Sequence, residues 1–388
     1  MLRDVFSQQT EFPNEPNQLA RARTQLIRTG RPLLDLTPSN PTAVGLSFGS
    51  DWLQLLARSK SLAYDPEPFG ALAARQAVAA RWKHRGEAVP AEQIVLSAST
   101  SEAYSHLFKL LCNPGDEVLV PQPSYPLFEH LARLEHVHLA GYRLGYDGSW
   151  YIDLDSLRRA QTTRTKAVIL VSPNNPTGSI VNEDELKVIA ALGLPVISDE
   201  VFSTFLFGKS RTRYESAIGI DSTLVFVLDG LSKSLGLPQC KLAWTSVVGP
   251  KGLVEQALSR IEIIADAFLS VATPIQYALP ELLEDEHDRH SVIISRLEQN
   301  LNVLEQLVRG SAATALATEG GWSAVLQLPS TRTESEWVLT LLEQDGVWLQ
   351  PGWFFDFERE SFVVVSLLTP SEDFKTGIER LVRRVNRE

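Results

Sequence analysis

Three stretches of this sequence decide its fold: KAVILVSPNNPTG at 166–178, LPVISDE at 194–200 and LVFVLDGLSKSLG at 224–236. Each contains a short run rich in β-branched and other apolar residues, which is typical of a buried strand. Each run ends in a polar cluster. Because ligands of open α/β sheets bind outside the carboxyl ends of the strands, we expect the three polar clusters to face one site.

Outside these stretches, strand-like runs continue to alternate with helical segments from residue 92 onward. Strands are expected at 94–96, 118–120, 168–171, 196–197, 224–228 and 244–248, with amphipathic segments such as 183–191 between them. This alternation predicts a mostly parallel sheet with helices on both faces, which is a three-layer α/β domain.

The last third of the chain has a different texture. Residues 251–308 repeat apolar residues at helical spacing, which predicts one long helix followed by another. Strands are expected at 323–328 and 362–368 and a final helix from 371, which together predict a smaller α+β domain. We therefore expect an N-terminal arm and part of the small domain in 1–40, a large ligand-binding domain in 41–285, and a small C-terminal domain in 286–388.

Composition excludes several classes of protein. The formal net charge of −11 argues against a nucleic-acid partner, because phosphate binding needs a basic surface. Two cysteines, Cys112 and Cys240, are too few for a disulfide framework and indicate a reducing compartment. Neither a secretory signal near Asp4 nor an apolar run of about 18 residues is found. We expect a cytoplasmic protein with no membrane partner and no metal.

Lys233 and Asp199 are the strongest candidates for chemistry. Lys233 follows a strand and lies between serines, where it is either a solvated loop lysine or a partly buried amine able to form a Schiff base. Asp199 ends a buried strand, where a carboxylate is costly unless it meets a cation or caps the following helix. A protonated pyridine nitrogen would be such a cation.

Three further segments carry candidate binding residues. Asn175, before Pro-Thr-Gly, is either a turn residue or a donor to a phenolic oxygen on a ring. Ser99, Thr100 and Ser101 open a helix, where their hydroxyls and free N–H groups suit a phosphate, although a capping box from Ser99 also explains the pattern. Tyr125 lies between prolines and suits either stacking on a flat ring or core packing.

In this order, the residues resemble the class I/II aminotransferases of fold type I, which use pyridoxal phosphate. The resemblance extends from about residue 33 to the C-terminus. The matching positions are Tyr64 with Gly70, Ser99-Thr100-Ser101, Tyr125, Asn175-Pro176-Thr177-Gly178, Asp199, and Ser232-Lys233 with Gly236.

The resemblance implies a role for each matching residue. Lys233 would hold the cofactor as a Schiff base and move the substrate proton, Asp199 would pair with the pyridine nitrogen, and Tyr125 would stack on the ring. Asn175 would bond the ring hydroxyl oxygen and is also a candidate for substrate contact. The phosphate would be held by Ser99, Thr100, Ser101, Ser232 and Lys241, and by Tyr64 of a neighbouring subunit, which implies a homodimer.

The sequence departs from the family pattern at three positions. Lys241 replaces the phosphate-binding arginine, which keeps the charge but loses the two-pronged geometry. Phe202 replaces the tyrosine that would accompany Asn175 at the ring oxygen. Val364 replaces the arginine that grips the substrate α-carboxylate. Either another group, with Asn40 ahead of Arg211 or Arg213, takes the carboxylate, or the amino donor is not an ordinary α-amino acid.

The resemblance therefore implies a transaminase that moves an amino group from an amino acid or amine to a 2-oxo acid by a ping-pong mechanism. A carbon–sulfur lyase or another elimination enzyme on the same fold is the main alternative. A non-catalytic sensor domain of a regulator is a lesser one, because residues 1–35 are too short for a DNA-binding module.

Overall fold

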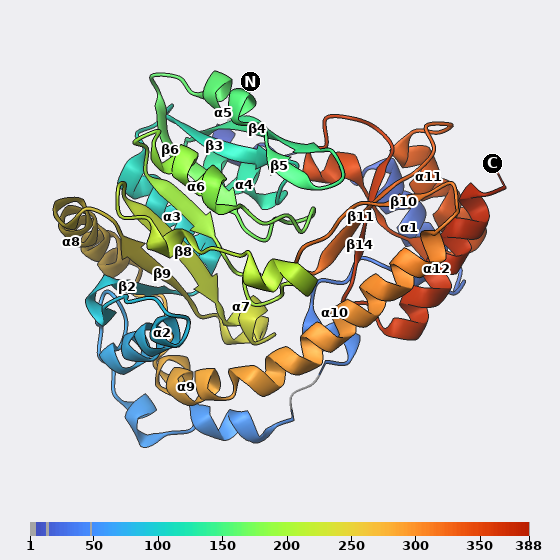
Figure 1. Cartoon of the computed structure of the whole chain (residues 1–388). Helices are drawn as coiled ribbons and strands as arrows, with labels where there is room; N and C mark the ends of the chain where they lie inside the picture. The colour runs from blue at the N-terminus through green and yellow to red at the C-terminus, as the bar shows by residue number, and fades with distance from the viewer. Residues whose placement is uncertain (1–4, 13–14, 47–48, 388) are drawn as a thin grey trace.

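The computed structural model describes residues 5–12, 15–46 and 49–387 (Figure 1). The residues up to Asp4, on which the expectation about a secretory signal partly depends, lie outside this part of the chain. No helix within the described ranges is both long and apolar enough to cross a membrane.

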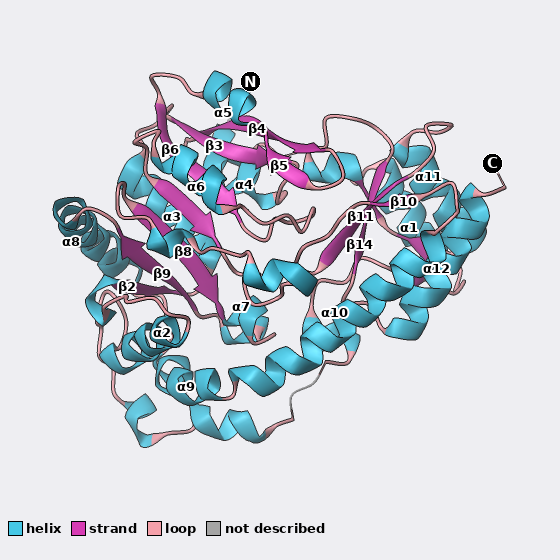
Figure 2. Cartoon of the chain, viewed as in Figure 1, coloured by secondary structure: helices cyan, strands magenta, loops and turns pink. Residues whose placement is uncertain are grey.

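Strands of the large sheet carry the three stretches quoted above. The sheet has eight strands in the order β2-β9-β8-β7-β6-β3-β4-β5 (Figure 2). Their bounds are β2 Ile94–Ser97, β3 Glu117–Gln122, β4 His138–Tyr146, β5 Trp150–Ile152, β6 Thr165–Val171, β7 Val196–Asp199, β8 Val225–Gly230 and β9 Ala243–Val248. The strands from β8 to β4 pair in parallel, whereas β9 and β5 run antiparallel to their neighbours. The predicted sheet is confirmed, with antiparallel strands towards its two edges.

Helices cover both faces of this sheet, because side chains of a strand point alternately to opposite faces. In β8, Val225 and Val227 pack on one face, with helices α2, α5, α6 and α9, and Phe226 packs on the other, with α3, α4 and α8. The bounds are α2 Leu72–His84, α3 Thr100–Leu111, α4 Leu127–Leu134, α5 Leu154–Ala160, α6 Glu183–Ala190, α7 Leu231–Ser234, α8 Lys251–Phe268 and α9 Thr273–Glu284. The fold is the predicted three-layer α/β arrangement.

A second, smaller apolar core lies at the other end of the molecule (Figure 1). It is built on an antiparallel sheet in the order β10-β11-β14-β13 and on the parallel pair β1-β12. The bounds are β1 Leu34–Asp35, β10 Thr314–Ala315, β11 Ser323–Gln327, β12 Val347–Trp348, β13 Gln350–Pro351, β14 Phe362–Ser366, α1 Gln18–Arg28, α10 Glu286–Val308, α11 Glu334–Thr340 and α12 Ser371–Val385. The domain boundaries after residues 40 and 285 stay a prediction.

The expectation of two helices in 251–308 is wrong, because the segment forms three: α8, α9 and α10. Helix α8 ends where Leu269 adopts a left-handed conformation, with φ of 46°. Helix α9 begins at Thr273, and Pro274 lies in its first turn, where the missing N–H costs no helical hydrogen bond. The apolar spacing continues across the break, so periodicity alone did not reveal it.

The segment after β7 joins the two cores. Phe207 N–H donates to the Glu319 carbonyl, Gly321 N–H donates to the Phe205 carbonyl, and Leu206 forms a β-bridge with Gly320. These backbone contacts hold the turn after Asp199 against the start of β11. As a result, the rings of Phe202 and Trp322, about 120 residues apart in sequence, meet beside the carboxyl edge of the large sheet.

Candidate active site

The carboxyl ends of five strands bring the predicted residues to one edge of the sheet. Strands β2, β3, β6, β7 and β8 all end at this edge. Asp199 is the last residue of β7, and Ser99, Tyr125, Asn175 and Lys233 follow β2, β3, β6 and β8 respectively. In the sheet register, Ser97 and Gly230 flank Ala243 on opposite sides. Strand β9, which begins at Ala243, thus lies between β2 and β8. Lys241, two residues before β9, therefore lies between the segments that lead to α3 and to Lys233.

Lys233 lies in the one-turn helix α7 with its amine covered by aromatic rings. Its Nζ is 4.8 Å from the centre of the Trp322 ring and 5.6 Å from that of Phe202. Burial lowers the pKa of Lys233 to about 8, against the opposing effect of the Asp199 carboxylate. About one tenth of the amine is therefore uncharged and nucleophilic at pH 7, far more than for an ordinary lysine.

Asp199 is 93% buried at the end of β7, since 7% of its surface is exposed. Tyr104 donates its hydroxyl to Oδ2 at 3.1 Å, and the Val201 N–H donates to Oδ1 at 3.3 Å. Burial raises the pKa of Asp199 to about 6, although both hydrogen bonds oppose this shift. The carboxylate is thus ionised at neutral pH and forms no ion pair with any residue that the structure describes, which suits a protonated ring nitrogen.

The start of helix α3 has the form of an anion site. Ser99 caps the helix by accepting the Glu102 N–H at 3.2 Å, while Glu102 Oε2 accepts the Ala98 N–H at 2.7 Å. The expected capping box is therefore not reciprocal, because the Glu102 carboxylate accepts the N–H of Ala98, one residue before the capping residue Ser99. The N–H groups of Thr100 and Ser101 lie in the first turn, where no helical partner is available, so they can bind a phosphate.

The donors expected to hold the cofactor are those that lack protein partners. The amine of Lys233, the amide of Asn175 and the hydroxyls of Tyr125 and Ser232 make no hydrogen bond to another described residue. All four residues are half-buried, so this edge of the sheet offers a set of unpaired polar groups to a polar ligand. The residues present therefore fit pyridoxal phosphate.

Tyr64 and Asn40 are the predicted site residues that precede the large sheet in sequence. Tyr64 is 76% exposed, as a residue meant for a neighbouring subunit would be. Asn40 uses its side-chain oxygen to accept from the N–H and the hydroxyl of Thr42, which leaves its amide N–H groups free of any described partner. Because Ser366 bonds the Leu36 and Pro38 carbonyls, the segment before Asn40 runs beside the end of β14.

The three departures from the family pattern have different surroundings. Phe202 is buried and its ring meets Trp322 edge-on at 5.4 Å. Val364 is 1% exposed in β14 and packs in the core of the large domain, whereas its neighbours Val363 and Val365 face the small core. Lys241 is exposed in a left-handed conformation, with φ of 49°.

The two arginines considered for the carboxylate are already engaged. Arg211 donates to the Leu206 carbonyl at 2.9 Å and pairs with Glu298, and Arg213 pairs with Glu319. Neither contact involves a residue of the sheet edge described above. These pairs make Asn40 the better candidate of those that the sequence offered.

Two neighbours of the site escaped the sequence analysis. Tyr104 bonds Asp199 across 95 positions of sequence, and Trp322 covers Lys233 from the small core. Neither residue is among the site residues predicted from the sequence, and Tyr104 lies one turn into α3. Only the helical position of Tyr104, on the turn after Ser99–Ser101, is a signal that could have found it.

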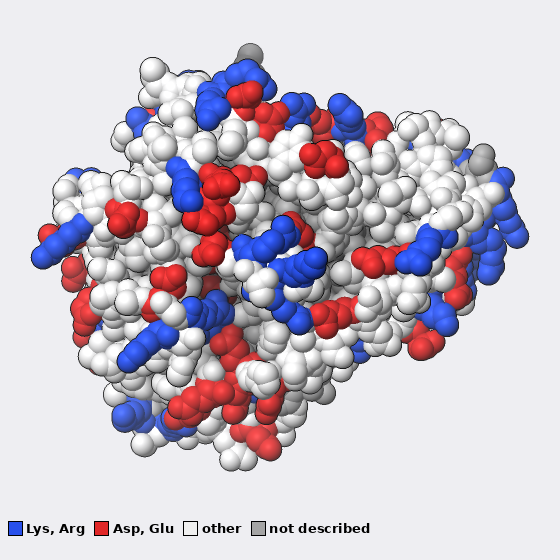
Figure 3. Space-filling model, in the orientation of Figure 1, with Lys and Arg blue, Asp and Glu red and all other residues white. Residues whose placement is uncertain are grey.

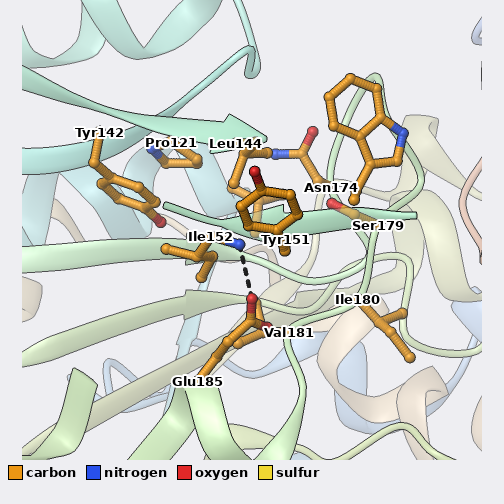
Figure 4. Close-up of a pocket in the computed structure, with 12 residues that line it drawn as sticks. Pro121, Tyr142, Leu144, Tyr151, Ile152, Asn174, Ser179, Ile180, Val181 and Glu185 are labelled. Atoms are coloured by element: carbon orange, nitrogen blue, oxygen red, sulfur yellow. Dashed lines mark hydrogen bonds between the residues drawn. The ribbon is translucent and has the colours of Figure 1, made fainter. Parts of the chain in front are cut away.

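A small cavity lies beside the loop that carries Asn174 and does not include Lys233 (Figure 4). Its volume is about 10 Å³, which suits a single water molecule. Trp150 Nε1 and Asn174 Nδ2 are buried there without a described partner, whereas Glu185 accepts the Ile152 N–H at 2.7 Å. The cavity is too small for a substrate, so we assign it to structural support of the loop.

The sequence matches the family model for aminotransferase class I and II over residues 50–381, which is most of the chain. The chain belongs to the class I and II aminotransferases. It is therefore a pyridoxal-phosphate-dependent transaminase that transfers amino groups, as the sequence predicted. This membership favours transfer over the elimination chemistry and the sensor role that were the alternatives.

Known aminotransferases are similar to this one over most of its length. Glutamate-pyruvate aminotransferase AlaA of Haemophilus influenzae is 23% identical over 372 residues, with 92% of each chain covered. Nicotianamine aminotransferase B of Hordeum vulgare is 29% identical over 300 residues, which cover 72% of this chain and 53% of that one. The structure of an alanine aminotransferase from Pyrococcus furiosus has a TM-score of 0.87 at 23% identity and covers 95% of this chain and 96% of that one. This similarity confirms the fold of type I.

Proposed function

We propose that Lys233 is the cofactor-bearing and proton-transferring residue of this aminotransferase. The observation that carries the proposal is its half-buried amine, which lies against two aromatic rings and whose pKa falls to about 8, at the same carboxyl edge of the sheet as the ionised Asp199. When bound, pyridoxal phosphate supplies an aldehyde and an electron-withdrawing ring that acidifies the substrate Cα–H bond. Lys233 Nζ would take that proton from the substrate Cα and deliver it to the cofactor.

The other residues would orient the cofactor and keep water out. Asp199 would hold the ring nitrogen in its protonated form, with Tyr104 fixing the carboxylate through the 3.1 Å hydrogen bond. Asn175 would donate to the ring oxygen, and Tyr125 would stack on the ring. Phe202 would contribute an apolar wall in place of a second donor.

The phosphate would lie at the start of α3. Ser99, Thr100 and Ser101 would contribute hydroxyl or N–H donors, and Ser232 and Lys241 would approach from the adjacent strand ends. Tyr64 of a second copy would complete the phosphate site, so we propose that the enzyme works as a homodimer. The cytoplasmic location expected from the two unpaired cysteines is part of the same proposal.

Mass mapping tests the cofactor attachment. Holoenzyme is reduced with borohydride and digested, and the phosphopyridoxyl mass is expected on the peptide that contains Lys233. A label on a different lysine, or no label at all, contradicts the proposal. With an amino donor and a 2-oxo acid, the product should be a new amino acid; release of ammonia and pyruvate instead would favour the carbon–sulfur lyase.

For the substrate, we propose an α-amino acid whose carboxylate is held by neutral amides of Asn40 and Asn175. Val364 cannot hold an anion, and Arg211 and Arg213 are committed to ion pairs. The free amide N–H groups of Asn40 support this choice. Amino acids and the matching amines should be compared by bleaching of the bound cofactor. Asn40→Ala should raise KM for amino acids alone, whereas equal reaction of carboxylate-free amines would overturn the assignment.

A further inference from the structure

A larger hollow opens one residue beyond Phe202, on a part of the surface that does not include Lys233. Its volume is about 620 Å³, within the range of small-molecule sites. Its walls come from the end of α2, the turn at Ser203 and Thr204, the segment 214–216, and the junction of α9 with α10. We call this hollow the α2–α10 cleft.

Arg85 is the arginine that lines the α2–α10 cleft. Its side chain is 28% exposed and makes one hydrogen bond, to Ser203 Oγ at 3.3 Å. The carboxylate nearest to it, Glu286, lies 3.8 Å away and is already bound by two nitrogens of Arg81 at 2.7 and 2.8 Å. Since a guanidinium has five N–H donors, Arg85 keeps several of them available for an anion in the cleft.

The rim of the cleft carries the opposite charge. Glu87, Glu215 and Glu284 line it, and no side-chain hydrogen bond or ion pair joins any of them to another described residue. In Figure 3 acidic side chains gather over α9 and the start of α10, below a basic group over the segment that follows β7. Trp82 and Tyr214 add aromatic surface to the walls.

We propose that the α2–α10 cleft binds a small zwitterion, with its carboxylate on Arg85 and its ammonium group facing the acidic rim. A simple anion would satisfy Arg85 but would be repelled by the glutamates. A simple cation would meet the acidic rim but leave the remaining N–H donors of Arg85 without an acceptor. A molecule that carries both charges matches the arginine and the glutamates that line the cleft.

The ligand in this cleft is not a reacting substrate. Lys233 Nζ faces the rings of Phe202 and Trp322, whereas Ser203 and Thr204 line the cleft. The proposal is therefore independent of the catalytic assignment above, and each can fail without the other.

Glycine betaine is the probe of choice, because its quaternary ammonium has no N–H and cannot condense with the cofactor. Calorimetric titration of holoenzyme should show saturable binding of betaine and weaker binding of its two halves, acetate and choline. Arg85→Gln should weaken betaine binding by at least about tenfold, since a charge-assisted contact is lost. Arg158→Gln, which removes an arginine whose side chain is 54% exposed on α5, should change nothing.

Glu284→Gln provides a second test that does not depend on the folding of the Arg85 variant, because Glu284 is exposed. It should weaken betaine and choline but not acetate. The proposal is overturned if wild-type holoenzyme shows no saturable betaine binding, or if Arg85→Gln folds and keeps full affinity. Competition of betaine with the amino donor, unaffected by Arg85→Gln, would place the probe in the catalytic site and would likewise overturn it.

Discussion

At the scale of single residues, the lowered pKa of Lys233 follows from what surrounds its amine. The Trp322 and Phe202 rings remove water, which favours the uncharged amine, and the Asp199 carboxylate favours the charged form. Desolvation is the larger effect, so the pKa falls below that of an ordinary lysine. A loop lysine in water would be protonated and unreactive at the same pH.

The first prediction concerns the titration of Lys233 in apoprotein. Labelling of Lys233 by a dilute acylating reagent should reach half its maximal rate near pH 8. Labelling of exposed lysines in the same sample should reach half its maximal rate only at about pH 10.4. Asp199→Asn should move the Lys233 midpoint lower still, because the carboxylate is what raises it. Peptide mass mapping gives the rate at each lysine. A midpoint for Lys233 equal to that of the exposed lysines would refute the explanation.

The second prediction concerns Phe202, which cannot donate a hydrogen bond. In Phe202→Tyr a phenol would stand beside the ring oxygen that Asn175 is proposed to contact, and it would stabilise the deprotonated form of the bound cofactor. The spectrophotometric midpoint of holoenzyme should therefore fall by about one pH unit, as a charge-assisted hydrogen bond implies. Phe202→Leu, which adds no donor, is the matched control. No shift, or a shift upward, in the tyrosine variant would exclude this role.

At the scale of elements, a buried ion network ties helix α2 to strand β8 just before Lys233. Arg81 pairs with Asp229 at 2.7 Å and with Glu286 at 2.7 Å, and its own side chain is 6% exposed. Asp229 also accepts the Gly230 N–H at 2.6 Å. The network therefore fixes the end of β8, from which α7 and Lys233 begin.

The third prediction removes the cation of this network. Arg81→Ala leaves the buried carboxylate of Asp229 without its partner, and Glu286 keeps only Arg85 at 3.8 Å, so the free energy of unfolding should fall by about 3–5 kcal/mol. Urea unfolding followed by fluorescence measures the loss. Arg158→Ala removes the partner of Asp155 in a pair whose side chains are 54% and 77% exposed, and it should leave the unfolding midpoint nearly unchanged. Similar small effects of both substitutions would show that the buried pair does not stabilise this end of β8.

At the scale of the whole molecule, catalysis depends on the meeting of two cores and, as proposed, of two copies. The backbone bonds between 205–207 and 319–321 bring Trp322 over Lys233. Tyr64, 76% exposed, lies with Leu269 and Ser270 around a shallow hollow of the surface. Ser270 in turn donates to Glu102 at 2.6 Å, near the proposed phosphate site.

The fourth prediction tests whether Tyr64 acts across a dimer interface. Lys233→Ala and Tyr64→Ala subunits should each be poorly active as homodimers. After mixing and reassociation, half of the dimers should be mixed and each should contain one intact site, which restores about a quarter of wild-type activity. Sedimentation confirms the dimer. If the mixture gains no activity although mixed dimers form, Tyr64 does not serve the neighbouring site.

The sequence by itself determined the strands of the large sheet and the polar residues at their ends, because both are local patterns. Runs such as 168–171 and the groups after them were predicted at the positions where the structure has them. The break into three helices within 251–308 was missed, because a left-handed residue such as Leu269 leaves no mark in apolar periodicity.

Only the tertiary structure decided which side chains surround these residues. The hydrogen bond from Tyr104 to Asp199, the position of Trp322 over Lys233 and the α2–α10 cleft all join segments far apart in sequence. The pKa of a lysine depends on how much water and which charges remain around it after packing. Spacing along the chain can identify the reactive group, but its environment is a property of the folded molecule.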